Sequence, residues 1–172
     1  MESKEKSKQQ LLTTCLLVVY LLILTWIILF KMQFSIEELD HFRSINLIPF
    51  HGSVIVNNRI HFSEIYGNVL IFVPFGIYIS MLKSNWSFLK KVASISSLSL
   101  FYEAMQFIFA IGASDITDIL ANTIGGIIGI AIYLVLRRIL KTGFKTNKIL
   151  NSIALIGTIC VGILLALLEL SN

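Results

Sequence analysis

The sequence predicts an all-α membrane protein, a bundle of five transmembrane helices, and three observations lead to this prediction. The 172-residue chain contains five apolar runs of 18 to 21 residues. Only 14% of its residues are charged, against about 25% in an average soluble protein. The charges gather in short clusters between the runs, and the mean hydropathy is +0.83. Because a bilayer core about 30 Å thick is crossed by about 20 helical residues, each run can span it. The predicted spans are residues 11–30, 65–82, 92–111, 116–136 and 149–168.

The first run follows three lysines, as a cleaved signal peptide would. However, a signal peptide has an apolar stretch of roughly 7–15 residues and ends at a small-residue cleavage site. This run has 20 residues and ends in bulky side chains. We therefore expect a retained first helix, and we expect residues 1–172 to form a single membrane domain.

The second, third and fourth runs carry polar residues inside their apolar stretches. The second run contains Asn68 and Pro74, and it is the shortest of the five. The third carries Glu103 and Gln106, and the fourth carries Asp118 and Asn122. Charged and amide side chains are costly in hydrocarbon and usually face the bundle interior or a wet cavity. These three helices are therefore the expected working core, with the first and fifth helices as lipid-facing supports.

The distribution of lysine and arginine predicts the orientation in the membrane. With the N-terminus in the cytoplasm and the C-terminus outside, 11 of the 14 basic residues fall in cytoplasmic segments. This distribution follows the positive-inside rule. The net charge of +4 then reflects topology and contact with lipid headgroups, and we expect no nucleic acid partner. In this orientation the polar residues of the three helices all lie in the outer half of the membrane. We expect their polar sides to meet in a cavity that opens outward.

Each candidate residue also has a structural interpretation. Asn68, Gln106 and Asn122 could simply form hydrogen bonds between helices. Asp115 precedes the fourth span and suits a helix N-cap. Four glycines, at positions where small residues allow membrane helices to approach closely, are expected to pack helices together: Gly76, Gly125, Gly126 and Gly129.

Glu103 is the strongest functional candidate, because an ionisable residue near the membrane midplane usually has a functional role. We expect its carboxyl group to share hydrogen bonds with Gln106 and Asn122. Asp118 is a second candidate and could orient Glu103 if the site is catalytic.

The long segment before the second span could cover the cavity as a lid. The residues that suggest this are Asn46, Pro49, Phe50 and His51. The three histidines of the chain match no zinc-binding spacing, and its two cysteines lie inside apolar runs. We therefore expect neither a metal nor a cofactor.

Four segments together resemble the VanZ-like family of bacterial membrane proteins. These are "NLIPF" at 46–50, "NVLIFVPFG" at 68–76, "EAMQF" at 103–107 and "DITDILANTIGGIIG" at 115–129. The resemblance covers about residues 44–137. It implies that the polar signature of the family maps onto Asn68, Glu103, Gln106, Asp115, Asp118 and Asn122.

The resemblance further implies a multi-pass protein of the bacterial cell membrane that reduces susceptibility to the lipoglycopeptide antibiotic teicoplanin. Teicoplanin carries a lipid tail and acts at the outer face on lipid-linked cell-wall precursor. The expected partners are membrane lipid and either that precursor or the lipoglycopeptide itself. A non-enzymatic accessory protein that acts on or shields such components is the first hypothesis.

Two other function classes remain open. An intramembrane enzyme could modify an envelope lipid or cell-wall precursor, with Glu103 as general acid or base. Against this, the sequence shows no nucleophile–base pair and no Gly-rich phosphate loop. A small transporter or channel is the third possibility, although transporters are typically built from internal repeats and none is visible here. The sequence does not predict an oligomeric state.

Overall fold

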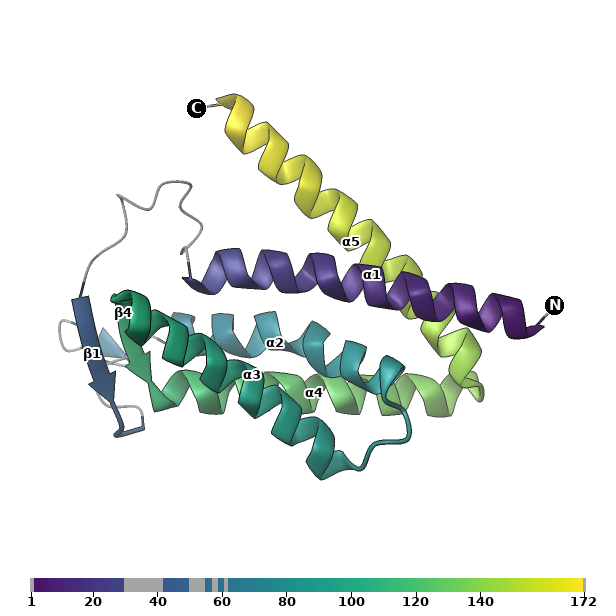
Figure 1. Cartoon of the computed structure of the whole chain (residues 1–172), viewed down its shortest axis with the longest axis horizontal. Coiled ribbons are helices and arrows are strands. Elements are labelled where there is room, and N and C mark those ends of the chain that lie inside the picture. The colour runs from purple at the N-terminus through teal and green to yellow at the C-terminus, as the bar shows by residue number, and fades with distance from the viewer. Residues whose placement is uncertain (1, 30–41, 50–54, 57–58, 61, 172) are drawn as a thin grey trace.

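A computed structural model describes residues 2–29, 42–49, 55–56, 59–60 and 62–171 of the chain (Figure 1). Its five long helices are α1 (Glu2–Leu29), α2 (Ser63–Leu82), α3 (Phe88–Phe109), α4 (Ile116–Leu140) and α5 (Gly143–Ser171). All five contain a stretch long and apolar enough to cross a membrane. The predicted bundle of five transmembrane helices is therefore confirmed, and the chain is a multi-pass membrane protein.

The helices at the two ends of the chain are longer than the apolar runs that predicted them. α1 begins at Glu2 rather than at residue 11, and α5 begins at Gly143 rather than at residue 149. The added residues are rich in lysine, glutamate and glutamine, which are good helix formers. The apolar run therefore marks the part of each helix that fits the bilayer, and not the end of its hydrogen-bond pattern.

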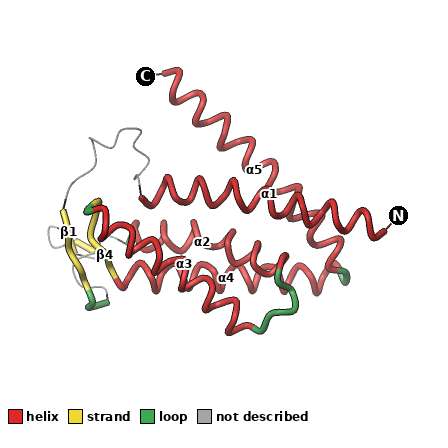
Figure 2. Tube along the Cα trace, viewed as in Figure 1, coloured by secondary structure: helices red, strands yellow, loops and turns green. Residues whose placement is uncertain are grey.

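Short strands occur at one end of the bundle (Figure 2), which the sequence analysis did not predict. β1 (Phe42–Asn46) pairs in parallel with β4 (Ile111–Asp115), and β2 (Ile55–Val56) pairs antiparallel with β3 (Arg59–Ile60). The predicted end of the third span at residue 111 was wrong. Ala110 takes a left-handed conformation with φ 57°, a common way for a helix to end, and so residue 111 already belongs to a strand.

Glycines bring α2 and α4 into backbone contact. A Cβ atom added to Gly76 would collide with the carbonyl of Gly126, and one added to Gly125 would collide with the carbonyl of Val69. A Cβ atom on Gly129 would meet Val73 in the same way. Such close approach maximises van der Waals contact between membrane helices. The α2–α4 pair is therefore the tightest helix contact in the bundle. This contact fixes the positions of the residues at the ends of the two helices.

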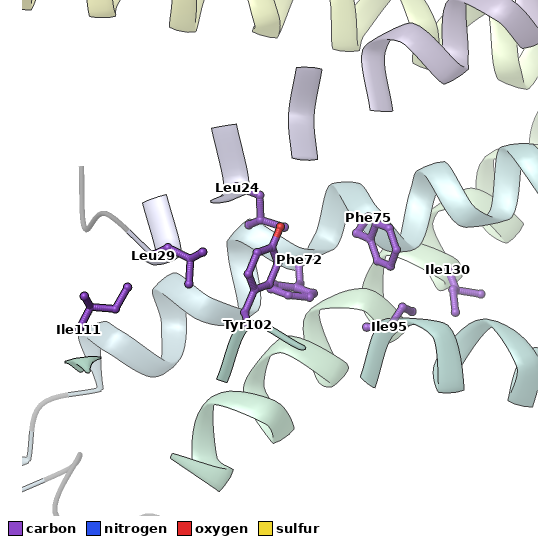
Figure 3. Packing of buried hydrophobic residues seen from close by; sticks show 8 residues of the cluster. All are labelled: Leu24, Leu29, Phe72, Phe75, Ile95, Tyr102, Ile111 and Ile130. Carbon is purple, nitrogen blue, oxygen red and sulfur yellow. The ribbon is translucent and has the colours of Figure 1, made fainter. Parts of the chain in front are cut away.

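α1 contributes to the hydrophobic core, so it is not simply the lipid-facing support that we expected from the sequence. Figure 3 shows Leu24 and Leu29 of α1 beside Phe72 and Tyr102 in one buried cluster. The Tyr20 hydroxyl donates a hydrogen bond of 2.7 Å to the Ile71 carbonyl, in the turn before Pro74. This contact ties α1 directly to the backbone of α2 beside the proline.

The buried side chains that α5 packs against the bundle, among those described, lie in its first half. Thr13 of α1 donates a hydrogen bond of 3.0 Å to the Asn151 side chain, and Asn151 in turn donates to Gln9. Beyond this crossing, α5 diverges from α1 toward the C-terminus (Figure 1). Most described side chains of its second half are exposed, as expected for a lipid-facing segment.

The two ends of the bundle differ in charge. We call the end that holds the start of α1, the α2–α3 turn (83–87) and the α4–α5 turn (141–142) the basic end, because lysines and arginines gather there. We call the opposite end, with β1 and β4, the acidic end (Figure 1). Glu103, Asp115 and Asp118 all lie toward the acidic end, within or beside helices α3 and α4.

Candidate functional site

Asp115 connects the small sheet to the start of α4. In the β1–β4 register it stands opposite Asn46, whose side-chain amide donates a hydrogen bond of 3.0 Å to Asp115 Oδ2. The other carboxyl oxygen, Oδ1, accepts from the Thr117 backbone N–H at 2.7 Å. The structure thus shows the N-cap that the sequence predicts, because one side-chain oxygen satisfies a free donor of the first helical turn. The same side chain also holds β1 in place.

Glu103 lies buried beneath this connection, with 5% of its surface exposed. Its Oε2 atom accepts a hydrogen bond of 2.9 Å from the Asp115 backbone N–H. The Ser114 hydroxyl donates to the Glu103 carbonyl at 2.7 Å. Both contacts come from β4, so the strand fixes the position of this carboxyl group. The prediction that Glu103 shares hydrogen bonds with Gln106 and Asn122 was wrong, because those side chains have partners elsewhere.

Gln106 and Asn122 tie helices together away from the Glu103 carboxyl group. Gln106 donates to the Ile28 carbonyl of α1 at 3.1 Å, and Asn122 donates to Ser99 of α3 at 2.9 Å. These contacts match the interpretation of both residues as interhelical hydrogen bonds. The side-chain oxygens of both residues are buried, and within the described part of the chain neither has a hydrogen-bond partner.

Asp118 pairs with Asn68 of α2. The Asn68 amide donates a hydrogen bond of 2.6 Å to Asp118 Oδ1, which links the acidic ends of α2 and α4. Glu103 contacts the Asp115 backbone, and Asp118 lies in the first turn of α4, three residues after Asp115. Three predicted acidic residues are therefore neighbours, and each has a hydrogen-bonding partner on a different element.

A pocket of about 420 Å³ opens beside these residues. Ligand pockets commonly enclose about 300–1,000 Å³ and combine apolar walls with a few fixed polar groups. Here the polar groups come from Asn46, Glu103, Ser114 and Asp115, and the rest of the lining is apolar: Ile45, Leu47, Leu100, Ala104, Phe107, Ile116 and Ile119. We call this pocket the acidic-end pocket.

The acidic-end pocket differs from the cavity expected from the sequence. It lies between β1, α3, β4 and the start of α4, and no residue of α2 lines it. Asn68, Gln106, Asp118 and Asn122 also lie outside its lining. The acidic-end pocket therefore does not bring together the polar sides of three helices, and α2 and α4 pack too closely to leave space between them at their glycines.

The expected lid is described only in part. Asn46 lines the acidic-end pocket, and Pro49 is exposed just beyond it. Phe50 and His51 lie outside the described residues. Within the described ranges, no group of three or more His, Cys, Asp or Glu side chains could hold a metal ion.

Sequence reasoning missed the residues that β1 and β4 contribute to the pocket. Ile45, Leu47 and Ser114 carry no functional signature of their own. The sequence offered one signal, which is the shortness of the stretch between the predicted third and fourth spans. In the structure this stretch runs extended, because a left-handed residue ends α3 and Asp115 caps α4.

Replacing Asp115 should test how much this connection contributes to stability. Asp115→Ala removes the N-cap and the contact with Asn46, so we expect a loss of about 1–3 kcal/mol in unfolding free energy. Ser87→Ala is the matched control, because Ser87 caps α3 through a longer contact of 3.4 Å at an exposed site. Thermal unfolding in detergent should show the larger loss for Asp115→Ala, and equal losses would contradict a linking role for Asp115.

Comparison with known proteins adds a relationship to this geometry. Residues 17–137 match the protein family described as VanZ/LLP1. The Protein VanZ of Enterococcus faecium is 43% identical over 126 residues, which cover 72% of this chain and 74% of that protein. No solved structure matches the chain. The matched range contains the second half of α1, all of α2 and α3, and α4 except for its last three residues, and it includes the whole lining of the acidic-end pocket.

Proposed function

The chain belongs to the VanZ/LLP1 family, and we propose that it reduces the susceptibility of a bacterial cell to lipoglycopeptide antibiotics such as teicoplanin. In this proposal the chain is a non-enzymatic protein of the cell membrane. It binds a lipid-linked envelope component at the outer face and shields that component from the drug.

The acidic-end pocket is the observation that carries this proposal. It places an apolar wall, formed by side chains such as Leu100, Phe107 and Ile119, beside the buried side chain of Glu103. A lipid-linked molecule has the same two parts, a hydrocarbon chain and a polar headgroup. The apolar wall suits the chain, and the carboxyl group suits hydroxyl or ammonium donors of the headgroup.

Charge distribution supports an outer location for this pocket. Eleven of the 14 basic residues lie at the basic end, either in its turns or in the helix ends next to them. The positive-inside rule then favours the basic end in the cytoplasm and the acidic end outside. A pocket at the acidic end would meet the leaflet in which lipid-linked precursor is exposed to the drug.

The proposal is tested by expressing the chain in a susceptible Gram-positive host. We expect a higher inhibitory concentration of teicoplanin, and little change for vancomycin, which lacks the lipid tail. Cells with an empty vector are the control, and membrane fractions should contain the protein. An equal shift for both drugs, or no shift despite normal membrane levels, would contradict the proposal.

An intramembrane enzyme is the second candidate, and the clustering of Glu103, Asp115 and Asp118 around the start of α4 favours it. Clustered carboxyl groups are typical of general acid–base sites. Mass spectrometry of lipid-linked precursor from the same cells separates the two candidates. A new precursor species would support the enzyme, whereas unchanged precursor together with reduced drug binding would support the shielding role.

A further inference from the structure

A second pocket, of about 320 Å³, lies at the basic end of the bundle, far from the acidic-end pocket. Four helices contribute to it: the start of α1, the end of α2, the end of α4 and the start of α5. Its lining includes two cations, Lys6 and Arg137, and several neutral polar side chains: Gln9, Gln10, Thr13, Ser84 and Asn147. None of its lining residues is acidic.

Arg137 lines this pocket together with Tyr133, which lies one turn earlier on α4 and is 2% exposed. Lys91 of α3, which is 5% exposed, adds a further positive charge at this end of the bundle. The positive charge of Arg137 attracts an anion that binds in the pocket.

The pocket also contains an unused hydrogen-bond acceptor. The Asn147 side-chain oxygen is buried and has no hydrogen-bond partner among the residues that the structure describes. A buried acceptor without a partner costs about 1–3 kcal/mol, so a ligand hydroxyl that donates to it would bind favourably. The cations of the pocket can bind a phosphate group, and the neighbouring acceptor can bind a hydroxyl group. A phosphate ester that carries hydroxyl groups has both.

We propose that the basic-end pocket binds the headgroup of an anionic phospholipid of the phosphatidylglycerol type. Arg137 and Lys6 contact the phosphate, and Asn147 accepts from a headgroup hydroxyl. A lipid is the expected source of this phosphate, because the pocket lies at the ends of four membrane-spanning helices and its remaining lining is apolar or aromatic: Met81, Leu82, Tyr133 and Phe144. Basic pockets between transmembrane helices are known to bind lipid phosphates.

The test uses the full chain in a neutral detergent and measures the thermal unfolding midpoint during lipid titration, because a ligand that binds only the folded state raises this midpoint. Phosphatidylglycerol should raise the midpoint at lower concentration than phosphatidylcholine. Arg137→Gln should weaken the apparent affinity for phosphatidylglycerol about tenfold. Arg138→Gln removes the same charge from the next residue, which does not line the pocket, and it should leave the affinity unchanged.

A steric variant tests the pocket without changing its charge. A Cβ atom on Gly143 would make only an ordinary contact with Arg137, so the Gly143→Phe side chain can enter the pocket and should block the lipid. Gly162→Phe adds the same ring to α5 where a Cβ atom meets nothing within 4 Å, and it should have no effect. If Arg137→Gln fails to fold, the Gly143→Phe and Gly162→Phe pair decides the result.

Three outcomes would overturn the proposal. Equal stabilisation by phosphatidylcholine would show that the anionic headgroup is not recognised. Equal stabilisation by glycerol 3-phosphate at comparable concentration would identify a soluble phosphate as the ligand. Equal losses for Arg137→Gln and Arg138→Gln, or for the two phenylalanine variants, would show that the pocket itself does not bind the lipid.

Discussion

Cells that express the Glu103→Gln variant should lose most of the protection against teicoplanin, while the variant still folds and reaches the membrane. The two side chains have the same shape, and a glutamine oxygen can still accept from the Asp115 backbone N–H, which Glu103 Oε2 does at 2.9 Å. The change replaces a carboxyl oxygen by an amide that can only donate. If a headgroup donor depends on that oxygen, the loss is about 1.5–3 kcal/mol, roughly tenfold or more in affinity.

The control for this variant is Glu5→Gln, which makes the same chemical change at an exposed residue of the basic end. It should protect as well as the original chain. Membrane levels of both variants must be compared by immunoblot. Full protection by Glu103→Gln would show that the carboxyl group has no role in function. Loss of the variant from the membrane would assign Glu103 a structural role instead.

The Gly125→Leu substitution should prevent the bundle from assembling. A Cβ atom at this position meets the backbone of Val69 on α2, so α2 and α4 would have to separate. Overpacking costs about 1–3 kcal/mol where side chains can move aside, and we expect more here because backbone atoms cannot. The Asn68–Asp118 hydrogen bond, which joins the same two helices at the acidic end, should be lost with the helix contact.

Gly162→Leu is the matched control, because its Cβ atom would meet nothing within 4 Å. Size-exclusion chromatography of detergent-solubilised protein should give a single folded peak for this control and aggregated or absent protein for Gly125→Leu. A folded Gly125→Leu protein with an unchanged unfolding midpoint would contradict the close packing of α2 against α4.

Several features of the candidate site could be predicted from single residues. Asp115 was identified as an N-cap because an aspartate stood directly before an apolar run. Glu103 was identified because burying an acidic side chain in a membrane helix is costly, so its presence indicates a purpose. Gln106 and Asn122 had two interpretations, and the structure gives them hydrogen bonds to α1 and α3.

The sequence alone determined the five helices and the separation of basic and acidic ends, because hydrophobic length and charge distribution are local properties of a membrane chain. Only the tertiary structure decided which polar groups meet. The parallel pairing of β1 with β4 joins residues about 70 positions apart, such as Asn46 and Asp115, which are separated by 69. Because of that pairing, the acidic-end pocket lies between the small sheet and the edge of α3. No local sequence pattern encodes the pairing, because its energy comes from contacts that form only after the bundle has assembled.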